Sequence, residues 1–167
     1  AVCDVMPIRK LNRLIAIVAL KNFNINKNTA FKELFYLNNK KDNLNIDDLG
    51  YLIGPILNAG GRLGKSNYAS ELLSSDDTHL INIKSKKLIE LNNKRKEIET
   101  LIIDEIDFEK IENENTDVII YYNPSIKEGL IGIIAARLKD YFNKPAIVIT
   151  KSNELLKGSA RSTSNYN

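Results

Sequence analysis

Two apolar runs with a helical pattern between them place the strongest constraint on the fold of this chain. The runs at 117–122 and 145–150 are typical of buried strands, and the stretch 129–141 has the apolar spacing of a helix. A strand, a helix and a strand within about thirty residues predict a βαβ unit, whose two strands are parallel and whose crossover is right-handed. The chain therefore contains at least part of an α/β domain.

The sequence after this unit predicts a third strand. A turn is expected at 152–154, and the chain from Leu156 onward is expected to return beside the preceding strand. In such a strand Ser159, Arg161 and Thr163 would point to one face, where they could bind a phosphate together. A flexible polar tail is the alternative interpretation of this segment.

The region before residue 113 is predicted to be mainly helical. Its apolar residues recur at helical spacing after Pro7, and the polar stretch 38–45 is typical of a loop. The expected helices cover 11–19, 29–37, a stretch from 47 into the segment 58–64, 66–73 and 76–108.

The last of these helices is unusually long, with neither proline nor glycine. Its apolar stripe is interrupted at Asn92 and Arg95, where core residues would be expected. The interruption indicates an inward polar contact, either to nucleic acid or to the protein itself. A coiled-coil spacer is the alternative interpretation of the whole stretch.

The segment NAGGR at 58–62 is the first candidate for binding chemistry. It places two glycines after a predicted helix and an arginine directly after them. Glycine allows the backbone to approach a ligand closely, and the guanidinium of Arg62 offers five donors to a phosphate. The alternative is a glycine that ends the helix, followed by a solvated arginine.

The residue inventory excludes several common catalytic sites. The single histidine, His79, has no cysteine or second histidine nearby in the sequence, so neither a zinc site nor a Ser-His-Asp triad is expected around it. The net charge of +3 does not by itself demand nucleic acid. One cysteine, Cys3, predicts a reducing, cytoplasmic setting, and no apolar run is long enough for a membrane span.

Five motifs, in this order, resemble the RecJ family of bacterial single-stranded-DNA exonucleases within the DHH phosphoesterase superfamily. They are CDVMPI with the following Asn12-Arg13, IGPILNAGGRLG, LNNKRKEIE, EGLIGIIAARL with NKPAIVI, and KGSARS. Two positions depart from the family pattern: Ile126 stands where tryptophan is usual, and Lys127 where histidine is frequent.

The resemblance implies roles for individual residues. Asp4 resembles the last metal-binding aspartate of the DHH domain, which makes it the expected catalytic and metal-ligating residue for Mn²⁺ or Mg²⁺. Arg62, Ser159 and Arg161 look like residues that hold the terminal 5′ phosphate and the neighbouring backbone, and Arg137 is expected to join them. The other metal ligands would precede this sequence.

The resemblance also implies a domain organisation and a fold class. We expect an internal segment of a longer enzyme, with the end of the DHH domain and a helical segment at 1–75, a connector helix at 76–112, and the first part of the DHH-associated domain at 113–167. The expected class is α/β, with a helix-rich connector segment followed by the first βαβ part of the associated domain.

The implied function is metal-dependent hydrolysis of phosphodiesters in single-stranded DNA, from 5′ to 3′, in DNA repair and recombination. We expect a cytoplasmic monomer with no membrane association. The segment alone is expected to be inactive, because one aspartate cannot hold the pair of metal ions that such hydrolysis often uses.

Two other interpretations remain open from the sequence. One is a related DHH phosphodiesterase acting on short oligonucleotides or cyclic dinucleotides, although those proteins have a glycine-rich, histidine-containing motif where this sequence has GSARS. The other is a non-catalytic piece: a nucleic-acid-binding fragment or a gene remnant.

Overall fold

The computed structural model describes residues 2–3, 6–41 and 43–166. The chain forms two compact units: a helical unit, Ala1–Gly61 with Lys65–Asn93, and an α/β unit, Arg62–Gly64 with Lys94–Asn167. The boundary between Asn93 and Lys94 falls inside one long helix, which therefore contributes residues to both cores.

The helical unit is built from short helices that pack around one apolar core. Its elements are α1 (Lys10–Asn22), η1 (Ile25–Lys27), α2 (Thr29–Leu37), η2 (Asp48–Ile53), α3 (Gly54–Arg62), α4 (Asn67–Ser74) and the first part of α5 (Thr78–Asp104). Buried residues of α2, η2, α3, α4 and α5 form the core, among them Leu34, Ile56 and Leu88. The Asn28 side chain caps α2 by accepting a hydrogen bond from the Phe31 N–H.

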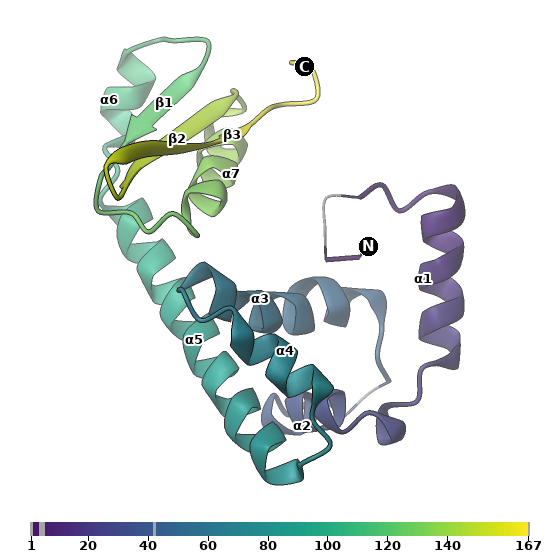
Figure 1. Cartoon of the computed structure of the whole chain (residues 1–167). Coiled ribbons are helices and arrows are strands. Elements are labelled where there is room, and N and C mark those ends of the chain that lie inside the picture. The colour runs from purple at the N-terminus through teal and green to yellow at the C-terminus, as the bar shows by residue number, and fades with distance from the viewer. Residues whose placement is uncertain (1, 4–5, 42, 167) are drawn as a thin grey trace. The chain divides into compact units, whose positions relative to one another are not determined.

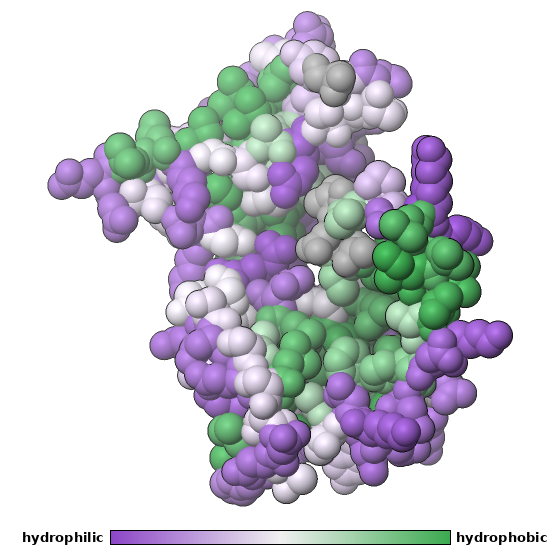
Figure 2. Space-filling model, turned by 45° about the vertical axis from the view of Figure 1, so that its right-hand side comes forward, coloured by the Kyte–Doolittle hydropathy of each residue, from purple (hydrophilic) through white to green (hydrophobic). Residues whose placement is uncertain are grey.

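The helix α1 leaves most of its apolar side chains exposed. Of its residues only Ala16 is buried. Figure 2 shows apolar side chains gathered over this helix, and they include Leu11, Leu14, Ile15, Ile17 and Val18. Helical spacing therefore predicted the helix correctly. It did not predict that the apolar side chains of α1 are left uncovered by the other described residues.

The α/β unit contains a small mixed sheet and its covering helix (Figure 1). Its elements are the second part of α5, α6 (Phe108–Asn113), β1 (Ile119–Tyr122), α7 (Ile131–Phe142), β2 (Ala146–Ser152) and β3 (Leu155–Arg161). Strands β1 and β2 are parallel, and α7 connects them, so the predicted βαβ unit and the α/β class are confirmed.

The third strand pairs with β2 through a tight hairpin. Strand β3 runs antiparallel to β2, and the two strands pair from Ser152 and Leu155 at the turn to Ala146 and Arg161 at the far end. Asn153 in the turn has a φ of +55°, a left-handed conformation that asparagine tolerates better than most residues. This register fixes the place of the GSARS segment on the sheet.

The inner face of α7 packs onto the sheet and helps to form the core of the α/β unit. Leu130, Ile134 and Leu138 are fully buried, as the helical spacing predicted. Ile126 is also buried in this core, and its carbonyl accepts a hydrogen bond from the buried hydroxyl of Thr150. That bond ties the loop before α7 to β2.

Three local expectations differ from the structure. The predicted long helix ends at Asp104, and α6 begins only at Phe108 after a short break. The predicted buried strand at 117–122 buries Ile119 but exposes Ile120 and Tyr122, because successive side chains of β1 point to opposite faces of the sheet. The glycines of NAGGR lie inside α3 rather than after it.

Candidate functional site

The first glycine of NAGGR, Gly60, serves the protein's own packing. An added Cβ at Gly60 would lie 2.5 Å from the carbonyl oxygen of Lys65, so this close approach is to backbone and not to a ligand. Gly61 has open space around it. Gly64, just beyond the end of α3, has a φ of +82°, as glycines that follow a helix often do.

The side chain of Arg62 is held within the α/β unit rather than solvated. Its Nη1 donates a hydrogen bond to the carbonyl oxygen of Gly129, at 3.2 Å. Burial lowers the pKa of the Arg62 guanidinium, and the positive charges of Arg95 and Arg161 lower this pKa further, while Glu99 acts in the opposite direction. Arg62 therefore lies in a region of concentrated positive charge.

Ser159 and Arg161 lie on the same face of β3, as the strand pattern predicted. Arg161 Nη1 donates to Ser159 Oγ at 3.1 Å and to the Ala160 carbonyl at 2.7 Å. Both side chains reach the first turn of α7, since an added Cβ at Gly132 would lie 2.8 Å from Arg161 Nη2 and 3.2 Å from Ser159 Oγ. Thr163, the third predicted residue, lies beyond the end of β3.

The N-terminus of α7 lies beside these two side chains. Leu130 occupies the N-cap position, and no side-chain hydrogen bond caps the helix there. The first amides of a helix have no partner within the helix, and the helix dipole makes this end favourable for anions. A cation, a hydroxyl and uncapped amides therefore gather where β3 passes α7.

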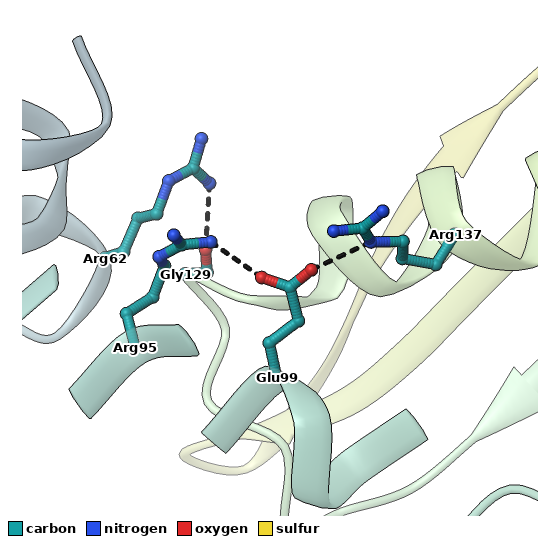
Figure 3. Close-up of polar contacts among 5 residues, drawn as sticks. All are labelled: Arg62, Arg95, Glu99, Gly129 and Arg137. Carbon is teal, nitrogen blue, oxygen red and sulfur yellow. Dashed lines mark hydrogen bonds and ion pairs between the residues drawn. The ribbon is translucent and has the colours of Figure 1, made fainter. Parts of the chain in front are cut away.

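A buried carboxylate joins two further arginines (Figure 3). Glu99 Oε2 accepts a hydrogen bond from Arg95 Nη1 at 2.6 Å, and Glu99 Oε1 accepts one from Arg137 Nε at 2.9 Å. Arg95 and Glu99 are one helical turn apart on α5, whereas Arg137 comes from α7. The polar interruption of the α5 stripe at Arg95 is thus a contact to the protein itself.

The structure brings most of the predicted site residues into one unit. Arg62, Arg137, Ser159 and Arg161 all belong to the α/β unit. Arg137 differs from the others because its predicted phosphate-binding side chain forms an ion pair with Glu99, while remaining 65% exposed. Asp4, the predicted metal ligand, lies outside the described residues.

The described part of the chain offers anion-binding groups but no metal centre. Among residues 2–3, 6–41 and 43–166, no three side chains of His, Cys, Asp or Glu lie together in a way that could hold a metal ion. The residues present therefore do not fit a resident metal by themselves, and His79 is exposed on α5. None of the described helices has the length and apolar character that a bilayer crossing requires.

Three residues of this site were not predicted from the sequence. Glu99 could have been found from its spacing, because a glutamate four residues after Arg95 lies on the same helix face. Gly129 and Gly132 gave no such signal, since their importance comes from close approaches of Arg62 and Arg161 that only the fold creates.

The comparisons with curated proteins and with solved structures agree with each other. No family model matches the chain. The chain is 31% identical over 99% of its length to the single-stranded-DNA-specific exonuclease RecJ of Bacillus subtilis, and 33% identical over 96% to that of Salmonella typhimurium. The chain is a relative of RecJ. The similarity to RecJ that the five motifs indicated is thereby confirmed.

The similarity to RecJ extends to the fold. A crystal structure of RecJ with Mg²⁺ from Thermus thermophilus matches 96% of the chain with a TM-score of 0.79 at 22% identity. A structure of exonuclease RecJ bound to manganese matches 98% of the chain with a TM-score of 0.78. The chain spans only about a quarter of the curated relatives, covering 22% of the Bacillus RecJ and 29% of the Salmonella RecJ.

Proposed function

We propose that this chain is part of a RecJ-like 5′→3′ exonuclease and that its α/β unit binds the phosphate backbone of single-stranded DNA. The observation that carries the proposal is the meeting of Ser159 and Arg161 with the first turn of α7, beside Gly132. The similarity to curated RecJ proteins over nearly the whole chain supports it.

The chemistry of these groups suits a phosphate. A guanidinium can donate two parallel hydrogen bonds to phosphate oxygens, a serine hydroxyl can donate another, and uncapped helix amides favour negative charge. Contacts of this kind position a strand without reading its bases. An exonuclease that accepts any sequence needs this kind of recognition.

Each proposed phosphate ligand has a distinct place in the α/β unit. Arg161 and Ser159 would hold one phosphate at the N-terminus of α7. Arg62, fixed by its bond to the Gly129 carbonyl, would add positive charge beside them. Arg137 would contribute through its terminal nitrogens, since its Nε is engaged by Glu99.

We propose that hydrolysis depends on Mn²⁺ or Mg²⁺ in the complete enzyme, with Asp4 as one ligand. The metal would activate water and neutralise charge on the leaving oxygen. The described residues contain no cluster of metal ligands, so no hydrolytic step is assigned to them. We expect the chain alone to bind DNA without degrading it. We propose that the complete enzyme is a cytoplasmic monomer that acts in DNA repair and recombination.

The binding proposal is tested with the full chain and metal-free buffer. Fluorescence anisotropy would compare a labelled oligothymidine carrying a 5′ phosphate with the same strand ending in a 5′ hydroxyl. We expect preference for the phosphate, and Arg161→Ala should abolish that preference. Arg161→Lys should restore part of it, because an ammonium supplies charge without the planar fork.

Lys151→Ala is the matched control for the loss of one positive charge. Lys151 is exposed on β2 and forms no hydrogen bond or ion pair through its side chain with a described residue. Equal losses from Arg161→Ala and Lys151→Ala would show that charge alone drives binding and would contradict the proposed site.

A further inference from the structure

The most informative group outside the proposed phosphate ligands is the carboxylate of Glu99. Its side chain is only 9% exposed, and each of its oxygens accepts a hydrogen bond from a different arginine, Arg95 or Arg137. A buried carboxylate costs free energy unless it is paired. Here the pairing also fixes two cations from two different helices.

The bond to Arg137 leaves the outer part of that guanidinium available. Glu99 engages Nε, and the terminal nitrogens Nη1 and Nη2 form no hydrogen bond with any described residue. Figure 3 shows these two nitrogens beyond the Nε that faces the carboxylate. Since the guanidinium is planar, fixing Nε also fixes the direction of the remaining donors.

We propose that Glu99 is a positioning residue for phosphate binding. It holds Arg137 by Nε so that the terminal nitrogens of this arginine meet the DNA backbone, and it holds Arg95 against α5 beside Arg62. This inference rests on the proposed function of the α/β unit. Glu99, although acidic, would thus strengthen the binding of the anionic DNA backbone.

This effect of Glu99 on DNA binding is opposite in direction to the effect that its negative charge alone would have. Removing one negative charge from a group of arginines should, by itself, strengthen the attraction for DNA. Removing the residue that orients those arginines should weaken binding to the terminal phosphate. Glu99→Asp separates the two effects, because it keeps the charge and withdraws the carboxylate by one methylene.

The experiment measures the affinity of the full chain for the 5′-phosphorylated oligothymidine and for its 5′-hydroxyl counterpart. We expect Glu99→Asp and Glu99→Gln to weaken binding of the phosphorylated strand about five- to tenfold, the size of one typical hydrogen bond. The matched controls are Glu97→Asp and Glu97→Gln. Glu97 is exposed on the same helix and has no side-chain partner among the described residues, so its variants should stay within about twofold.

A second measurement asks whether Glu99 acts through Arg137. In an Arg137→Ala background, Glu99→Asp should change the affinity by clearly less than it does alone, because the positioned group has gone. Circular dichroism would establish that each variant is folded. Should Glu99→Gln fail to fold, Glu99→Asp and its double variant keep the inference testable.

The outcomes separate this inference from the function on which it rests. Tighter binding by Glu99→Gln would overturn it, since the carboxylate would then compete with phosphate for the arginines. An unchanged effect of Glu99→Asp in the Arg137→Ala background would also overturn it. If Arg161→Ala leaves the preference for the 5′ phosphate intact, the proposed function itself fails; if only the Glu99 variants are silent, the inference alone fails.

Discussion

Arg62 and Gly129 hold each other through two independent contacts. Nη1 of Arg62 donates to the Gly129 carbonyl, and the backbone of Arg62 lies so close that an added Cβ at Gly129 would collide with the Arg62 carbonyl oxygen. Arg62 and the loop that precedes α7 are thus packed backbone to backbone, and the position of one proposed phosphate ligand depends on a glycine.

Gly129→Ala should therefore destabilise the protein. The new methyl group would collide with backbone atoms of Arg62, which cannot rotate away as a side chain could. We expect a loss of about 1–3 kcal/mol in the free energy of unfolding, typical of overpacking. Urea unfolding followed by circular dichroism measures this loss.

Gly61→Ala is the control for that variant. Gly61 lies in α3 with no atom within 4 Å of an added Cβ, so alanine should raise stability by about 0.5–1 kcal/mol through its better helix propensity. Equal stability changes for the two variants would contradict the close packing of Gly129 on Arg62.

Gly132→Ala should weaken DNA binding without lowering the stability of the protein. An added Cβ would displace the Arg161 guanidinium and Ser159 hydroxyl, both of which are ends of flexible side chains, while alanine favours the helix α7. We expect unchanged or higher thermal stability with severalfold weaker binding of 5′-phosphorylated single-stranded DNA. Unaltered affinity would mean that Ser159 and Arg161 do not bind phosphate at this turn.

The salt dependence of binding should distinguish charge from geometry. Arg62→Ala and Arg161→Ala should each reduce the slope of log affinity against log salt by about 0.7, the value for one phosphate contact on a single strand. Arg161→Lys should keep the slope of the parent chain and still bind more weakly. Titrations at several salt concentrations test this pattern, and an Arg161→Lys variant with full affinity would refute it.

The exposed carboxylate of Glu128 predicts a small pH dependence of stability. The hydroxyl of Ser152 lowers the pKa of Glu128 below its ordinary value of 4.5, and the ammonium of Lys157 lowers it further. A depressed pKa gives a stabilising contribution that is complete above pH 4.5 and is lost as the pH falls through the pKa of the folded state.

Glu128→Gln should thus lower the melting temperature slightly at pH 7, and the difference from the parent chain should disappear in strong acid. Melting curves across this range measure it. Glu154→Gln is the control, because Glu154 is exposed in the adjacent turn with no side-chain partner among the described residues. A difference that persists at the lowest pH would rule out the ion pair as its cause.

Periodicity predicted the elements of this fold well because local spacing determines them. The limits of α2 coincide with the predicted 29–37, and the βαβ unit and the hairpin lie where apolar runs and a turn indicated. Burial was harder to predict. Ile120 and Tyr122 on one face of β1 are exposed, and so are most apolar residues of α1, because burial depends on which elements pack against each face.

The sequence singled out the residue types of the candidate site but not their contacts. Arg62, Ser159 and Arg161 stood out because arginine and small hydroxyls beside glycine suit phosphate. The NAGGR glycines were misplaced, because a helix can continue through Gly60 and Gly61 when a neighbouring backbone packs closely against it. The engagement of Arg137 by Glu99 joins residues 38 positions apart, which no local pattern contains.

Because β3 pairs with β2, the candidate site depends on whether the number of residues inserted or deleted in the hairpin is odd or even. Side chains alternate between the faces of a strand, and Ser159 and Arg161 are paired with Val148 and Ala146. Inserting or deleting one residue between the hairpin turn and Ser159 would rotate both side chains to the opposite face, away from α7. A change of two residues would return them to it, displaced along the strand. Related sequences that keep the site should therefore differ in length between the hairpin turn and Ser159 only by an even number of residues.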